Sequence, residues 1–433
     1  MNTLTHHIPG LILNSHRFEL PVDYAKPDAA KISVFAREVI APGKEHADLP
    51  YLVFFQGGPG SGSPRPMGNS GWLKRALKEF RVLLLDQRGT GSSTPITAQT
   101  LRHLTPDAQA DYLQNFRADN IVRDAEAIRK VLIGEKPWSI LGQSFGGFCA
   151  MNYLSTAPEG LKEVLITGGI PSLTRPTDDV YRATYPRVIA KNHAYYQRFP
   201  DDVQRVREIV QHLSEHDVQL PSGGRLTVQR FLQIGLSFGM SDGYEAVHYL
   251  IEDAFVDGTG EAQNREINWN FLSHLEHSQS FDTHPIYSLL QEACYTQQAA
   301  SDWSAERLMH EFPQFNHDAN TVGPVLFTGE MIYPWMFDQY PQLQSLKKAA
   351  ELLAKKTDWP MLYDVERLRK NRVPVAAAVY YDDMYVHREF SEETAQIVPN
   401  VKLWVTSEYE HNGLRANGEH VVDRLLKIAR GEL

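Results

Sequence analysis

One short stretch of the chain constrains its fold more than any other: a glycine-rich turn between an apolar run and a helix-like run. The turn Gly142-Gln143-Ser144-Phe145-Gly146-Gly147 follows Trp138-Ser139-Ile140-Leu141 and precedes Phe148-Cys149-Ala150-Met151. It matches G-x-S-x-G, in which a serine stands at a sharp strand-to-helix turn and the glycines let strand and helix approach each other. We therefore predict that Ser144 is a nucleophile. The alternative is a glycine-rich turn with an incidental serine.

A second glycine-rich turn lies upstream, where Gln56-Gly57-Gly58-Pro59-Gly60 follows the strand-like Tyr51-Leu52-Val53-Phe54-Phe55. In an α/β-hydrolase a turn at this place supplies one backbone N–H to the oxyanion hole. The other donor is the N–H of the residue after the nucleophile. We predict an oxyanion hole built from Gly57, Gly58 and Phe145.

A third segment is an apolar strand that ends in a polar turn interrupted by glycines. It reads Val82-Leu83-Leu84-Leu85-Asp86-Gln87-Arg88-Gly89-Thr90-Gly91-Ser92-Ser93. We interpret Asp86 and Arg88 as a structural pair that fixes this turn, rather than as participants in chemistry.

Together, Q-G-G-P-G, D-Q-R-G-T-G-S-S and G-Q-S-F-G-G resemble the motifs of the prolyl aminopeptidase (proline iminopeptidase) family of α/β-hydrolase serine peptidases, above all its longer bacterial members. Members usually begin the first motif with histidine, where this chain has Gln56, but the glycines are kept. The resemblance implies a serine exopeptidase that releases N-terminal proline from short peptides through a Ser-His-Asp acyl-enzyme mechanism. How strictly such an enzyme prefers proline stays open.

Composition limits the classes of partner. The net charge of -10 argues against nucleic acid, because phosphate binding relies on clustered Lys and Arg. The cysteines Cys149 and Cys294 form no metal-binding spacing, and no cofactor motif occurs, so we expect neither a metal nor another cofactor. No apolar run is long enough for a membrane span, and no secretory signal is recognised at the N-terminus. We expect a cytoplasmic protein; its oligomeric state stays open.

The order of the expected elements indicates the fold. Strands are expected at 51–55, 82–85, 138–141, 164–169, 373–380 and 401–405, helices near 72–79, 119–132 and 418–429, and a lead-in hairpin at 16–40. This alternation predicts an α/β fold with a doubly wound, mostly parallel sheet. The region between the fourth and fifth of these strands is helical and aromatic. We predict an α/β-hydrolase catalytic domain at 1–177 and 357–433, and a helical cap at 178–356 that recognises the substrate N-terminus.

The turns after the two last strands supply candidates for the rest of the triad, because the chain order in this fold is Ser, then Asp or Glu, then His. We predict Asp383 as the acid, since the family acid resembles the residue directly before Met-Tyr-Val, and Asp382 is the alternative. We predict His411 as the base, because it follows the last strand and precedes the final helix. His420, inside that helix, and His387 are the rivals.

Two cap glutamates stand among apolar and aromatic residues, where a lone carboxylate is costly. They are Glu292 and Glu330, each of which could instead be a capping or surface residue. By resemblance, their segments look like those that bind the substrate α-amine in prolyl aminopeptidases. The candidates for the walls of a proline slot are Phe145, Cys294, Tyr295, Tyr333 and Trp335.

Two other functions remain open. A carboxylesterase or amide hydrolase of the same fold would need the same triad but no amine site. A non-catalytic hydrolase-like binding protein would not react with a serine-directed fluorophosphonate. Epoxide hydrolases and dehalogenases of this architecture use an aspartate nucleophile, which Ser144 argues against.

Overall fold

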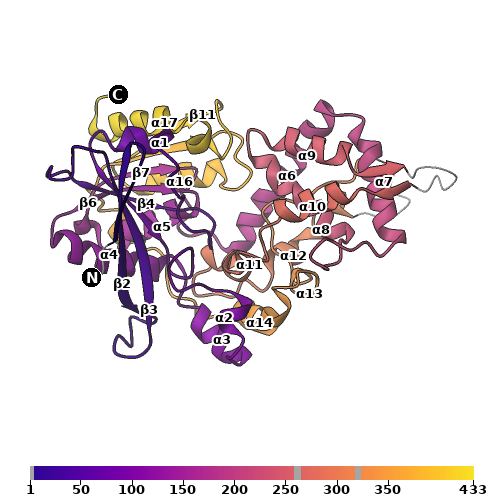
Figure 1. Cartoon of the computed structure of the whole chain (residues 1–433), viewed down its shortest axis with the longest axis horizontal. Coiled ribbons are helices and arrows are strands. Elements are labelled where there is room, and N and C mark those ends of the chain that lie inside the picture. The colour runs from indigo at the N-terminus through magenta and orange to yellow at the C-terminus, as the bar shows by residue number, and fades with distance from the viewer. Residues whose placement is uncertain (1–3, 258–264, 317–322) are drawn as a thin grey trace.

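A nine-stranded, mostly parallel sheet carries the turns singled out above (Figure 1). The computed structural model describes residues 4–257, 265–316 and 323–433. In spatial order the strands are β1 (Leu4–Ile8), β2 (Leu11–Pro21), β3 (Lys31–Ile40), β5 (Arg81–Asp86), β4 (Tyr51–Phe55), β6 (Trp138–Gln143), β7 (Leu161–Thr167), β10 (Val375–Tyr380) and β11 (Val401–Thr406). From β5 to β11 all neighbours are parallel, whereas β1, β2 and β3 form an antiparallel extension joined to β5. The predicted α/β-hydrolase sheet is confirmed.

Helices cover both faces of the sheet, which is why its central strands are apolar throughout. On one face α4 (Ala118–Ile133) packs on α5 (Phe145–Thr156), which contacts β4, β6 and β7. On the other face α1 (Gly71–Ala76) lies beside α17 (Gly413–Arg430), which contacts β7 and β10 (Figure 1). Each face has its own hydrophobic core. Shorter helices complete this part of the molecule: α2 (Ala98–Leu101), α3 (Pro106–Leu113), α15 (Val365–Leu368) and α16 (Arg388–Ile397).

Between β7 and β10 the chain leaves the sheet and forms a group of helices, most of which gather at the right of Figure 1. They are α6 (Thr177–Arg198), α7 (Asp202–Glu215), α8 (Val228–Leu232), α9 (Gly243–Glu252), α10 (Trp269–Ser278), α11 (Pro285–Leu290), α12 (Ser304–Met309), α13 (Met336–Gln339) and α14 (Lys347–Lys355). The same region contains a small antiparallel pair of strands, β8 (Phe255–Asp257) and β9 (Arg265–Ile267), between α9 and α10. We call residues 177–355 the helical insertion. The longest member, α6, buries a stripe at helical spacing that includes Tyr181, Val188 and Tyr195.

The turn after β5 corrects one prediction: Asp86 and Arg88 are both structural, but they do not pair with each other. Asp86 binds Arg65 through two hydrogen bonds of 2.5 and 2.9 Å. Arg88 is buried and binds both carboxylate oxygens of Asp124 on α4, at 2.6 and 2.8 Å. Because the chain turns directly after Asp86, the two side chains leave it toward different parts of the fold.

None of the helices in the described ranges has both the length and the apolar character that crossing a membrane requires. The cytoplasmic location stays a prediction from the sequence.

Candidate active site

Ser144 stands at the turn between β6 and α5 in a conformation that few non-glycine residues adopt. Its φ is 54° and its ψ is -124°, which is typical of a nucleophile at a sharp turn. The glycines of the motif allow this turn. A Cβ on Gly146 would collide with the carbonyl oxygen of Phe55, and one on Gly147 with that of Gly169.

The turns after β10 and β11 bring Asp383 and His411 together. The Nδ1 of His411 lies 2.8 Å from the Oδ2 of Asp383, and the two residues are 4% and 3% exposed, respectively. Because a carboxylate only accepts hydrogen bonds, Nδ1 carries the proton and Nε2 is left as the basic nitrogen. Asp383 is itself oriented by the N–H groups of Tyr385 and Val386, which donate to its Oδ1 at 2.8 and 3.0 Å.

The electrostatics of His411 reflect this pairing. Burial disfavours the imidazolium, but the charge and hydrogen bond of Asp383 outweigh it and raise the pKa of His411. The rivals are placed differently. Asp382 binds Arg187 at 2.8 Å, His387 contacts Glu389, and His420 is exposed on α17. The structure therefore pairs Asp383, not Asp382, with His411; their catalytic roles stay predictions.

Ser144, His411 and one of the predicted glutamates, Glu330, line a single cavity of about 240 Å³. The first glycine-rich turn forms another part of its wall. A Cβ on Gly57 would lie 3.0 Å from the Cβ of Ser144, so this backbone passes directly beside the serine. The cavity is lined by Gln56, Gly57, Gly58, Ser61, Gln143, Ser144, Gln233, Ile234, Leu236, Ser237, Met240, Ser278, Gln279, Ser280, Phe281, His284, Tyr287, Glu330, Tyr385 and His411.

Phe145, directly after the serine, is the residue predicted to supply the second backbone N–H of the oxyanion hole. It is the first residue of α5, so its N–H belongs to the end of the helix that favours negative charge. The arrangement can therefore hold an anionic oxygen near Ser144.

Glu330 is the acidic group that enters this cavity from the helical insertion. Its Oε1 accepts a hydrogen bond of 2.7 Å from the hydroxyl of Tyr287. Burial raises the pKa of Glu330 to about 7, although the Tyr287 hydrogen bond and His411 act in the opposite direction. A carboxyl group in this state can bind and neutralise a cation close to the serine.

Glu292 does not line the cavity that holds Ser144. Its Oε1 accepts a hydrogen bond of 3.0 Å from the N–H of Ala305, which places the carboxyl group at the start of α12. Its Oε2 is buried and lacks a hydrogen-bond partner among the described residues, and burial raises the pKa of this group. The position corresponds to the capping alternative considered for this residue.

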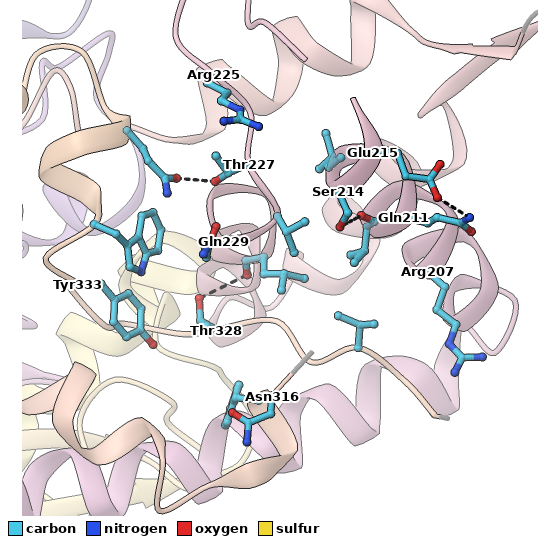
Figure 2. A pocket seen from close by; sticks show the side chains of 18 of the residues that line it. Arg207, Gln211, Ser214, Glu215, Arg225, Thr227, Gln229, Asn316, Thr328 and Tyr333 are labelled. Carbon is cyan, nitrogen blue, oxygen red and sulfur yellow. Dashed lines mark hydrogen bonds between the residues drawn. The ribbon is translucent and has the colours of Figure 1, made fainter. Parts of the chain in front are cut away.

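None of the five candidates for the walls of the proline slot, Phe145 included, is among the residues that line the Ser144 cavity. Cys294 is buried, and its thiol donates to the carbonyl of Leu290, while Tyr295 packs edge-on against Phe148. Tyr333 and Trp335 stack with ring centroids 5.6 Å apart and line a second cavity, of about 1080 Å³, between α7, α8 and the segment before α13 (Figure 2). The two cavities share no lining residue.

Sequence reasoning missed several residues that do line the Ser144 cavity. Tyr385 belongs to the Met-Tyr-Val segment that identified the acid, and Tyr287 lies about one and a half helical turns before Glu292 in the sequence. Both could have been found as aromatic neighbours of predicted site residues. Gln233 and Phe281 carry no such signal in the sequence. Within the described ranges, no group of His, Cys, Asp and Glu residues is arranged to hold a metal ion.

Comparisons with known proteins bear on this site. A family model described as the alpha/beta hydrolase fold matches residues 50–252. A proline iminopeptidase of Aeromonas sobria is 50% identical over 433 residues, which cover 99% of this chain and 100% of the relative. The proline iminopeptidase aneH of Aspergillus aculeatus is 37% identical over 441 residues, which cover 99% of this chain and 96% of that protein. The chain belongs to the proline iminopeptidase family of α/β-hydrolases.

The family predicted from the three motifs is thus confirmed. Among solved structures, a proline iminopeptidase of Mycobacterium smegmatis is 16% identical with a TM-score of 0.44, covering 96% of this chain and 100% of that one. In this chain, Gln56 stands where members of the family usually have histidine in the first motif. Its carbonyl accepts a hydrogen bond of 3.1 Å from the side chain of Gln87, and it lines the Ser144 cavity with Gly57 and Gly58.

Proposed function

We propose that this protein is a serine exopeptidase that releases an N-terminal proline from short peptides. The observation that carries the proposal is the presence of Ser144, His411 and Glu330 in one small cavity, which combines a nucleophile, its base and an amine-binding carboxylate. The names of the full-length relatives supply the specificity for proline. A carboxylesterase or amide hydrolase would have no use for Glu330.

In the first half of the reaction, the Oγ of Ser144 attacks the carbonyl carbon of the N-terminal residue. The Nε2 of His411 takes the serine proton, and Asp383 stabilises the imidazolium that forms. The N–H groups of Phe145 and of the Gly57-Gly58 turn bind the oxyanion of the tetrahedral intermediate. The intermediate collapses, His411 protonates the leaving amine, and an acyl-enzyme with Ser144 remains.

In the second half, a water molecule attacks the acyl carbon with His411 as the base. The second tetrahedral intermediate expels the Oγ of Ser144, which recovers its proton from His411. Free proline and the original enzyme result, and every proton that His411 accepts is returned within the cycle.

Glu330 gives this hydrolase its preference for a free N-terminus. A buried ammonium is costly unless a carboxylate pairs with it. The secondary ammonium of proline has two N–H donors, and Glu330 offers acceptor oxygens held in place by Tyr287. Phe281, Ile234 and Leu236 provide apolar wall for the ring. A cavity of about 240 Å³ is better suited to a compact N-terminal residue such as proline than to a residue with a long side chain.

We further propose that residues 1–177 and 357–433 act as the catalytic domain and residues 178–356 as a cap that recognises the substrate N-terminus. The support is the origin of the lining residues. The serine, the histidine and the first glycine-rich turn come from the sheet part, whereas Gln233, Tyr287 and Glu330 come from the helical insertion.

The test compares four substrates: proline para-nitroanilide, its N-acetylated form, alanine para-nitroanilide and para-nitrophenyl acetate, with Ser144→Ala as the blank. We expect fast cleavage of the free prolyl amide and loss of cleavage on acetylation, because the acetylated nitrogen has no charge for Glu330. If only para-nitrophenyl acetate is cleaved, and this cleavage depends on Ser144, the protein is an esterase and not an aminopeptidase.

A further inference from the structure

Helix α6 buries a charge where its other buried residues are neutral. Of the ten residues of α6 that are buried, all within the described part of the chain, Lys191 alone is charged, and it is 6% exposed. A buried ammonium without a counter-charge costs several kcal/mol of folding free energy. We therefore expect a carboxylate to pair with Lys191.

That partner is Glu410, the residue directly before His411. The Nζ of Lys191 lies 2.6 Å from the Oε1 of Glu410. The hydroxyl of Tyr244, from α9, donates to the backbone carbonyl of Lys191 at 3.1 Å and so ties α9 to α6 at the same residue. The ion pair therefore joins the helical insertion to the turn that carries the catalytic base.

The same turn is also linked to the insertion through the segment between α8 and α9. The backbone N–H of His411 donates to the carbonyl of Gly239 at 3.1 Å. The side chain of Asn412 accepts a hydrogen bond of 3.1 Å from the N–H of Ser241. The Lys191–Glu410 pair is the charged contact among these links, whereas the others join neutral groups, so it is the contact that charge neutralisation would release.

One helical turn before Lys191, the same helix binds the loop of the catalytic acid. Arg187 donates to Asp382, the residue directly before Asp383, at 2.8 Å. Two basic residues at i and i+4 on α6 thus hold the carboxylates that precede Asp383 and His411. The Asp382 side chain is 55% exposed, so this second pair is screened by water and contributes less.

We propose that Lys191 is a positioning residue, whose ion pair with Glu410 fixes the approach of His411 to Ser144. The inference rests on the proposed catalytic roles of Ser144, Asp383 and His411. No residue of α6 lines the Ser144 cavity, so the role of this helix is to hold the base in the place where proton transfer is fast. Displacement of a catalytic group by about 1 Å can cost on the order of 100-fold in rate.

The experiment measures how fast Ser144 reacts with a fluorophosphonate, because this reaction needs His411 but no amine recognition. The variants are Lys191→Met, Glu410→Gln and the double variant. The matched control is Arg182→Met, which removes a basic residue of the same helix whose ion pair with Glu311 stays within the insertion. Unfolding by urea establishes that each variant is folded under assay conditions.

We expect Lys191→Met to slow the labelling of Ser144, and kcat for proline para-nitroanilide, by about 10-fold to 100-fold, with KM changed by less than about 3-fold. The double variant should be no slower than Lys191→Met, because both substitutions break one contact. Arg182→Met should label at the rate of the unmodified protein. Labelling of Lys191→Met at that same rate would overturn the proposal.

If Lys191→Met does not fold, Glu410→Gln decides, since glutamine keeps the shape and an acceptor for Lys191 while it removes the charge. A labelling rate reduced by about 3-fold or more supports the positioning role, and an unchanged rate overturns it. Absence of labelling in the unmodified protein would instead contradict the proposed serine-hydrolase function. Labelling of that protein without cleavage of the prolyl amide would contradict only the substrate.

Discussion

The hydroxyl of Tyr287 donates a hydrogen bond of 2.7 Å to the carboxyl group of Glu330, and both side chains line the cavity of Ser144. Tyr287 holds Glu330 in place without supplying a positive charge. Burial can therefore keep the pKa of Glu330 at about 7. A group with this pKa changes its charge within the range in which most enzymes work, which leads to the first two predictions.

The affinity for prolyl substrates should rise with pH. A carboxyl group with a pKa of about 7 is mostly neutral at pH 6 and mostly charged at pH 8, so KM for proline para-nitroanilide should fall across this interval. Glu330→Gln should raise KM at pH 8 and remove the pH dependence, while it leaves hydrolysis of para-nitrophenyl acetate nearly unchanged. Equal effects on the amide and the acetate would count against an amine-binding role.

The same substitution should stabilise the fold at alkaline pH. Because the folded-state pKa of Glu330 lies above the ordinary 4.5, the folded protein binds this proton more tightly, and stability is lost as pH rises from 4.5 to about 7. Glu330→Gln removes this cost, up to about 3 kcal/mol above pH 7 and less at pH 5.5. Urea unfolding of both proteins at pH 5.5 and at pH 8 measures this difference in the free energy of unfolding. A Glu330→Gln variant less stable than the original at pH 8 contradicts this assignment.

The two adjacent aspartates should behave very differently. Asp383→Asn should lower kcat by about 10⁴-fold, because an amide partner no longer stabilises the imidazolium or fixes the tautomer of His411. Asp382→Asn should cost less than about 3-fold, since its pair with Arg187 is exposed. Steady-state kinetics with proline para-nitroanilide provide the comparison, and similar losses in both variants would refute the choice of Asp383.

A methyl group at Gly57 should damage catalysis without unfolding the protein. Its Cβ would lie 2.6 Å from the Oε1 of Gln143 and 3.0 Å from the Cβ of Ser144, so the oxyanion turn or the residues around Ser144 have to shift. Gly57→Ala should lower kcat by about 100-fold, the cost of losing one oxyanion donor. Gly68→Ala is the control, because a Cβ there meets no atom within 4 Å among the described residues. An active Gly57→Ala variant would remove this turn from the site.

Arg88 should prove essential for stability and not for chemistry. Arg88→Met would leave the buried carboxylate of Asp124 without its cation, which costs about 3 to 5 kcal/mol. The exposed Arg369→Met should change stability by less than about 0.5 kcal/mol. Urea unfolding gives both values, and kcat per folded molecule should not change. A small loss in Arg88→Met would show that the pair is dispensable.

The sheet could be predicted well because its strands are buried on both faces and read as apolar runs. The strand predicted at 51–55 is β4 to the residue, and the helix predicted at 119–132 is α4 with one more residue at each end. The strands β1 and β8 were missed for a physical reason. Residues Leu4–Ile8 form an exposed edge strand, and Phe255–Asp257 is a three-residue strand, so neither shows an apolar pattern.

The candidate site also has a part that could be predicted from the sequence and a part that could not. The pairing of Asp383 with His411 follows from chain order, because parallel strands end at one edge of the sheet. The position of Glu292 does not follow from order, since it depends on where α12 begins relative to α11. Asp86 and Arg88 show the same limit: their structural character could be predicted, but their partners Arg65 and Asp124 lie too far away in the chain.

The insertion of 177–355 between two strands that pair with each other has a consequence for synthesis. Strand β7 ends at Thr167, and its partner β10 begins only at Val375. At about 5 to 20 residues per second, a ribosome needs roughly 10 to 40 s to make the chain between them. During that time one edge of β7 lacks its partner strand, and Ser144 has been made without His411, its predicted base. The nascent chain is thus expected to be inactive until β10 and His411 have been made. The unpaired edge of β7 is the site of possible aggregation that a chaperone would have to cover.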